Sequence, residues 1–240
     1  MRKDRGIIFV AFGKEYDKLA ANTLKYSRKF TDLPFYVLTN LEKRDGIWNG
    51  ISDVTFKFIP LAANENRKVK VSIINYSPFD ETLYIDVDAV IQRFGIEEIF
   101  DLLKISDVVC QSICQPFSPK TELQRKIYDK MATALGESFP INRICGGIYL
   151  FKKSENSFQF FSLWEKYYEL NDTGRDMPAL CFAVKHCSSF IKILKENDKV
   201  NLFHLKENNK CFVQHNNFSN WGKKFGISSY ERWIPPLGDK

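Results

Sequence analysis

The sequence predicts an α/β protein with a mostly parallel central sheet flanked by helices. Short apolar runs at 7–12, 35–38, 54–59 and 82–85 are typical of strands that are buried on both faces. Segments with apolar residues at helical spacing follow the first run and precede the last. The resulting order β-α-β…β-α-β is that of a parallel sheet with helical crossovers.

Local sequence signals mark the ends of the predicted strands and helices in the N-terminal half. Gly13 ends the first strand, and residues 14–30 then repeat apolar positions every three or four residues, which predicts a helix. Asn40 closes the second strand and Pro60 closes the third, as turn-forming and strand-breaking residues do. Residues 67–75 predict a second helix before the fourth strand.

The C-terminal half is less regular. Prolines interrupt residues 112–141, and Gly146-Gly147 is expected to precede a strand. We predict helices at 96–105, 120–136, 157–170 and 178–184, and strands at 107–110, 148–151 and 211–213.

Length and charge limit the organisation and the ligands. A chain of 240 residues with 44% apolar residues forms one large domain or two small ones. No linker or repeat divides it, so we expect a single domain over 1–240 with a C-terminal arm at 211–240. The net charge of +6 suits anionic ligands such as nucleotides, permits a nucleic acid or a membrane surface, and equally fits an ordinary soluble surface.

Cysteine usage and the N-terminus bear on the compartment. The six cysteines contain no C-x-x-C pair, which argues against a zinc site. The apolar run at 7–12 is too short for a signal peptide or a membrane span. We therefore predict a cytoplasmic protein with reduced cysteines.

The most informative motif is the acid pair Asp86 and Asp88, which follows the apolar strand at 82–85. In an extended segment, side chains two residues apart point to the same side, so both carboxylates can meet one cation. Ligands of open α/β sheets bind at the carboxyl ends of the strands, where this pair lies. A chain with 15 Asp residues contains about one Asp-x-Asp by chance, so the motif depends on its surroundings.

Those surroundings resemble the GT-A glycosyltransferases, and in particular the family-8-like group of glycogenin and the bacterial lipopolysaccharide galactosyltransferases. The resemblance covers roughly residues 6–225 and departs from the group at Met177, where the group has Gln. The motifs that carry it, in order, are Ala11-Phe-Gly-x-x-Tyr16, Arg67 with Lys70, Tyr84-x-Asp-x-Asp88, Asn142 with Gly146-Gly147, Asp176-Met-Pro-Ala-Leu180 and His215.

The resemblance implies a metal-dependent enzyme. Asp86, Asp88 and His215 would bind Mn²⁺ or Mg²⁺, and an imidazole ligand would favour Mn²⁺. The alternatives are acids that begin a turn and a surface histidine. Asp176 and Asn142 would take the catalytic positions. The implied contacts to the nucleotide sugar are Phe12, Gly13, Tyr16, Asn40, Arg67, Lys70, Asp86, Val87, Gly146, Gly147 and Lys223, with Lys224 as an alternative to Lys223.

Several of these residues have an ordinary structural alternative. Tyr16 is also the first core position of its helix, and Asn40 also fits a turn. The basic residues at 67–70 could form a solvated helix face. Asp176 could cap a helix, and Lys223 could belong to a solvated tail.

The expected activity is the transfer of a sugar, with retention, from a nucleoside-diphosphate sugar, with a UDP-sugar favoured. The arm at 211–240 would close over the donor, and residues 112–141 and 171–176 would form the acceptor wall. The acceptor itself stays open among a glycan, a lipid-linked sugar, a protein and a modified nucleic acid. Two alternatives remain: a haloacid-dehalogenase-like phosphatase with Asp86 as nucleophile, and an inactive nucleotide-sugar-binding protein.

Overall fold

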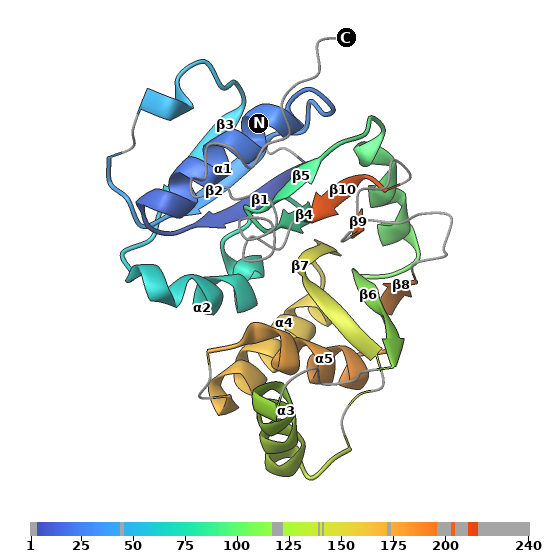
Figure 1. The fold of residues 1–240 in the computed structure, drawn as a ribbon. Helices are drawn as coiled ribbons and strands as arrows, with labels where there is room; N and C mark the ends of the chain where they lie inside the picture. Colours follow the sequence, from blue (N-terminus) through green and yellow to red (C-terminus); the bar gives the residue numbers. More distant parts are fainter. Residues whose placement is uncertain are drawn as a thin grey trace.

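The computed structural model describes residues 4–43, 46–116, 122–138, 140, 142–171, 174–195, 203–204 and 211–215. Its centre is a seven-stranded sheet in the order β3-β2-β1-β4-β7-β6-β8 (Figure 1). The strands are β1 (Arg5–Ala11), β2 (Phe35–Thr39), β3 (Val54–Phe58), β4 (Glu81–Ile85), β6 (Val108–Pro116), β7 (Asn142–Lys152) and β8 (Ile191–Leu194). All neighbouring pairs are parallel except the two that β7 makes with β4 and β6, so the predicted mostly parallel sheet is confirmed.

The strand order creates a switch point between β1 and β4. From β1 the chain builds outward through β2 and β3, and it then returns to place β4 on the other side of β1. Helix α1 (Lys14–Ser27) follows β1 and leads to β2 on one side of it, whereas the strands of this sheet that come after β4 in the chain lie on the other side. Such a point opens a crevice at the carboxyl ends of the two strands, and open α/β sheets bind their ligands there.

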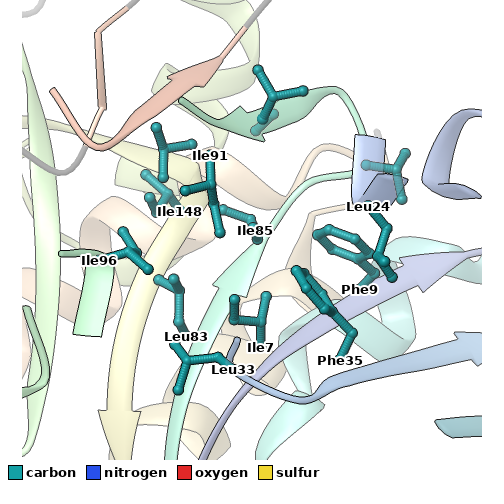
Figure 2. Packing of buried hydrophobic residues seen from close by; sticks show 14 of the residues in the cluster. Ile7, Phe9, Leu24, Leu33, Phe35, Leu83, Ile85, Ile91, Ile96 and Ile148 are labelled. Atoms are coloured by element: carbon teal, nitrogen blue, oxygen red, sulfur yellow. The ribbon is translucent and has the colours of Figure 1, made fainter. Parts of the chain in front are cut away.

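Alternating side chains of each strand form two separate cores. In β1, Ile7 and Phe9 point into one core, and Ile8 and Val10 point into the other. Figure 2 shows part of the first core, where Leu24 of α1 and Ile96 lie against residues of β1, β2 and β4. The sheet is thus buried on both faces, which explains its continuous apolar runs.

Different helices cover the two faces. The first core packs against α1 and a 3₁₀ helix, η4 (Ile96–Lys104), and also takes in Trp48 of η1 (Gly46–Trp48). The second core packs against α2 (Asn66–Val71), η3 (Ile73–Asn75), α3 (Glu122–Leu135), α4 (Glu155–Leu170) and α5 (Asp176–His186). A further 3₁₀ turn, η2 (Ala63–Glu65), precedes α2.

A small second sheet joins the late chain to the end of β4. Strand β5 (Ala89–Ile91) pairs antiparallel with β10 (Val213–His215), which pairs parallel with β9 (Phe203–His204). We predicted a strand near 211–213, but not β5, β8 or β9, which have four residues or fewer. Residues 216–240 of the expected C-terminal arm lie outside the described residues.

Three sequence-based predictions were wrong in detail. The helix expected at 67–75 is two shorter helices, α2 and η3, separated at Ser72. The segment at 96–105 is a 3₁₀ helix. The Gly146-Gly147 pair does not precede its strand but lies within β7, because β7 extends six residues further toward the N-terminus than its apolar run.

None of the helices in the described part of the chain is long and apolar enough to span a membrane.

Gly6, near the N-terminal end of β1, provides a test of the packing against the sheet. A Cβ atom at this position would lie 2.2 Å from Cζ of Phe79, whose side chain is buried. We expect Gly6→Ala to lower the free energy of unfolding by about 1–3 kcal/mol, because the ring must move within a packed core. Urea denaturation measures the change, and Phe79→Leu should recover part of the loss in the double variant. An unchanged Gly6→Ala protein would contradict the packing.

Candidate active site

A pocket of about 170 Å³ opens at the switch point between β1 and β4. Val10 comes from β1, Tyr16 from the first turn of α1, and Tyr84 from β4. The complete lining is Val10, Tyr16, Asn66, Arg67, Lys70, Tyr84, Asp86, Val87 and Asp88. Six of the expected site residues, namely Tyr16, Arg67, Lys70, Asp86, Val87 and Asp88, therefore meet at the edge of the sheet that the topology selects.

The acid pair lies in a turn, and not in an extended segment as we expected. The Ala89 N–H donates to the Asp86 carbonyl at 3.0 Å, which closes the turn at the end of β4. The backbone is fixed on both sides, because the Asp86 N–H donates to Gly147 O and the Thr23 hydroxyl donates to Val87 O. Both carboxylates nevertheless line the same pocket, although they do so from a turn.

Lys70 joins the acid pair to a second element of the site. Its ammonium lies 3.0 Å from Asp86 Oδ1 and 2.9 Å from Asp176 Oδ2. The residue is 8% exposed, because α2 packs it against the sheet, and its carbonyl accepts a hydrogen bond from the Tyr149 hydroxyl. One buried cation therefore bridges the carboxylates at the ends of β4 and at the start of α5.

Asp176 is the first residue of α5, where the helix dipole favours a negative charge. The residue before it, Arg175, occupies the cap position, so the alternative of a capping Asp176 is not supported. The Trp164 indole donates to the Asp176 carbonyl at 3.0 Å, and Arg67 Nε lies 3.7 Å from Oδ1. The side chain is thus held by the cations and its backbone by α4.

The charges of the bridge support one another. Burial opposes the ionised form of Asp176, but the attraction and hydrogen bond of Lys70, together with the charge of Arg67 and a backbone hydrogen bond, outweigh it and lower the pKa of this carboxyl. Burial also opposes the charge on Lys70, yet Asp176 and Asp86 together raise the pKa of its ammonium above the usual value. We call Lys70, Asp86 and Asp176 the ion triad, because the two carboxylates share one cation.

Tyr84 is a site residue that the sequence analysis did not assign. Its hydroxyl donates to Asp86 Oδ1 at 2.5 Å, and its ring stacks on Tyr149 with centroids 4.7 Å apart. Burial, followed by the negative charge of Asp86, raises the pKa of Tyr84 well above its usual value, so the hydroxyl remains a donor. The available signal was its position two residues before Asp86, on the same face of the strand.

The two glycines of β7 have separate roles. A Cβ atom at Gly146 would lie 3.3 Å from Asp176 Oδ2 and 3.6 Å from Lys70 Nζ. Gly146 therefore leaves the space in which the Lys70–Asp176 pair forms. Gly147 acts through its backbone, since its carbonyl accepts from the Asp86 N–H at 2.8 Å.

The loop after β1 is followed by Tyr16, which contributes its side chain to the pocket. Tyr16 is 45% exposed and lines the pocket, so it is not a core residue. The side chain of Phe12, in contrast to its expected position at the ligand, is fully buried in the second core and does not line the pocket. Gly13 has a φ of 83°, and its N–H donates to Asn40 Oδ1 at 2.7 Å. Because the Asn40 amide also donates to Leu61 O, this side chain holds two loops together.

The remaining predicted residues are described in part or not at all. His215 and Asn142 have described backbones in β10 and β7, but their side chains lie outside the described residues, as does Lys223. The His215 backbone pairs with Ala89, the residue after Asp88. Within the described part of the chain, no three His, Cys, Asp or Glu side chains form a metal-binding group. The two pocket carboxylates are hard oxygen ligands that suit Mn²⁺ or Mg²⁺.

Comparison with known proteins identifies the fold. Neither a protein-family model nor a curated protein sequence matches the chain. Among solved structures, mouse xyloside xylosyltransferase 1 aligns with a TM-score of 0.61 at 9% identity, over 89% of this chain and 98% of that one. The galactosyltransferase LgtC, solved with donor and acceptor sugar analogues, aligns with a TM-score of 0.58 at 13% identity, over 95% and 93%.

The bifunctional glycosyltransferase WbbM is a third structural neighbour, with a TM-score of 0.56 at 12% identity. The alignment covers 90% of this chain and 46% of WbbM, so the chain spans about half the length of that protein. These neighbours share the GT-A glycosyltransferase fold, and the expected fold is thereby confirmed.

Removing the shared cation tests the ion triad. We expect Lys70→Met to lower the free energy of unfolding at pH 7 by about 3 kcal/mol, because two carboxylates lose a buried partner. The lowered pKa of Asp176 stabilises the fold above its unfolded-state pKa, and this contribution is lost as the pH falls through the folded-state pKa. The difference between wild type and variant should therefore shrink in acid. Urea denaturation at several pH values measures it, and an equal difference at every pH would contradict the triad.

Proposed function

We propose that the protein is a metal-dependent glycosyltransferase that uses a nucleoside-diphosphate sugar, with UDP as the favoured nucleotide. The observation that carries the proposal is the gathering of Asp86, Asp88, Arg67 and Lys70 in one pocket at the switch point of a GT-A fold. A pocket with two carboxylates and two cations suits a ligand that brings both a metal ion and a diphosphate.

Asp86 and Asp88, together with His215 from the neighbouring strand β10, would hold Mn²⁺ or Mg²⁺. When bound, such an ion neutralises the charge that develops on the leaving diphosphate. The pairing of the His215 backbone with Ala89 supports the third ligand, because it brings β10 beside the acid pair.

The chain's own residues would orient the donor. Arg67, with 43% of its side chain exposed, can reach a phosphate or a sugar hydroxyl as a fork of donors. Asp176 stays ionised and can accept a hydrogen bond from a sugar hydroxyl. Tyr16 presents its ring at the mouth of the pocket, where it can stack on a uracil. Transfer with retention of configuration is proposed from the resemblance to the family-8-like enzymes.

The rival enzyme class fits the fold less well. A haloacid-dehalogenase-like phosphatase carries its nucleophile after the first strand, whereas Asp86 follows the fourth strand of this sheet. An inactive nucleotide-sugar-binding protein would have the same pocket, and the activity measurement below distinguishes it. The acceptor could be a glycan, a lipid-linked sugar, a protein or a modified nucleic acid.

Nucleotide binding is tested by thermal shift with UDP and UDP-sugars in the presence of Mn²⁺. A ligand at 100 times its dissociation constant should stabilise the wild type by about 2.7 kcal/mol. Asp88→Asn should lose this gain, because the metal bridge to the diphosphate is weakened. Asp101→Asn is the matched control, since this carboxylate is 61% exposed and pairs with Lys104 on η4.

The outcomes separate the functions. Release of UDP from a UDP-sugar with Mn²⁺ supports the transferase, and binding without release supports the inactive protein. A wild type that neither binds nor hydrolyses any sugar nucleotide would refute the proposal, and so would full stabilisation of Asp88→Asn.

Tyr16 tests the position of the base. Tyr16→Ala should weaken UDP binding by about 1–3 kcal/mol through the loss of stacking, while Tyr16→Phe should retain most of the affinity. The thermal stability of the free protein should change little, because the side chain is 45% exposed. Isothermal titration with UDP and Mn²⁺ measures both variants, and equal affinities for Ala and Tyr would place the base elsewhere.

A further inference from the structure

We infer that Lys70 makes cation binding at the acid pair depend on the diphosphate: its charge weakens binding of the metal ion alone, and the diphosphate removes this penalty. The inference rests on the proposed function and adds a regulation of that same site. It concerns how strongly the binding of the metal ion depends on the binding of the diphosphate.

The first step is the competition for Asp86. Both of its carboxylate oxygens lie near the ammonium of Lys70, at 3.0 Å for Oδ1 and 3.3 Å for Oδ2. Oδ1 also accepts the Tyr84 hydroxyl. A metal ion that binds Asp86 must therefore share a carboxylate that already has a cation and a donor, and two like charges must lie close together.

The second step is that Lys70 cannot easily withdraw. It is 8% exposed, and its ammonium lies between Asp86 and Asp176 and 5.3 Å from the centre of the Tyr84 ring. Its backbone carbonyl is bonded to Tyr149. A lysine held on all these sides acts as a fixed charge, whereas an exposed lysine would swing away into solvent at little cost.

The third step is the balance of charge. The carboxylates of Asp86, Asp88 and Asp176 and the cations of Lys70 and Arg67 leave one net negative charge among these five groups. A divalent ion alone reverses that charge, while a divalent ion with a doubly charged diphosphate restores it. Because each charge in a partly buried site is weakly screened, the ion and the diphosphate should bind with positive coupling.

The experiment compares Mn²⁺ binding with and without UDP, followed by the electron paramagnetic resonance signal of free Mn²⁺. In the wild type, saturating UDP should tighten Mn²⁺ binding by on the order of tenfold or more. Lys70→Gln, which keeps polar contacts to both carboxylates, should bind Mn²⁺ alone on the order of tenfold more tightly than the wild type. Its coupling to UDP should be correspondingly smaller.

Two controls isolate the charge of Lys70. Lys68→Gln makes the same charge change on the same helix at an exposed position and should leave Mn²⁺ binding within about threefold of the wild type. Lys70→Arg keeps the charge and should retain weak binding of Mn²⁺ alone. Circular dichroism confirms that each variant is folded, and Lys70→Met serves as a second neutral variant.

The failures are distinguishable. If the wild type shows no Mn²⁺-dependent binding of UDP or any UDP-sugar, the proposed function fails. If UDP binds with Mn²⁺ but neither folded neutral variant binds Mn²⁺ alone more tightly than the wild type, the function stands and the inference about Lys70 is overturned. Equal tightening in Lys68→Gln would also overturn it, because the effect would then be one of overall charge.

Discussion

The site depends on one buried cation shared by two carboxylates that belong to different parts of the fold. Lys70 comes from α2, Asp86 from the end of β4 and Asp176 from the start of α5, and the three meet within hydrogen-bonding distance. The approach requires a strand without a side chain at Gly146, an indole that holds the backbone of α5 and a tyrosine beneath Asp86.

The pairing within the triad also explains how charged groups can be buried at the edge of the two hydrophobic cores. Charged groups below the surface are costly unless they are paired and hydrogen-bonded. Here every member of the triad has at least two partners. The stacked rings of Tyr84 and Tyr149 belong to the second core and lie between it and the charged groups. The same arrangement that makes the charges tolerable keeps them fixed for a ligand, which is the preorganisation that binding sites need.

The sequence was sufficient for the fold class and for most of the pocket, because both follow from local patterns. Buried strands have apolar runs, and acids at a strand end fall at the sheet edge that binds ligands. Contacts between residues far apart in the sequence could not be predicted. Examples are the hydrogen bond from Gly13 to Asn40, the burial of Phe12 and the space that Gly146 leaves for Asp176. The short strands β5, β8 and β9 were also missed, since so few residues carry too weak a pattern.

The pairing of β5 with β10 has a consequence for the order of events during synthesis. The seven strands of the main sheet are complete once β8 has left the ribosome, so the chain can bury the second core and most of the first at that stage, before Phe212 and Val213 join the first core. The strand that carries His215 emerges later and joins the acid pair through a contact of long sequence separation, which forms slowly. A nascent chain would therefore reach a folded but incomplete state first, and it would gain its full capacity to hold a ligand when β10 joins β5.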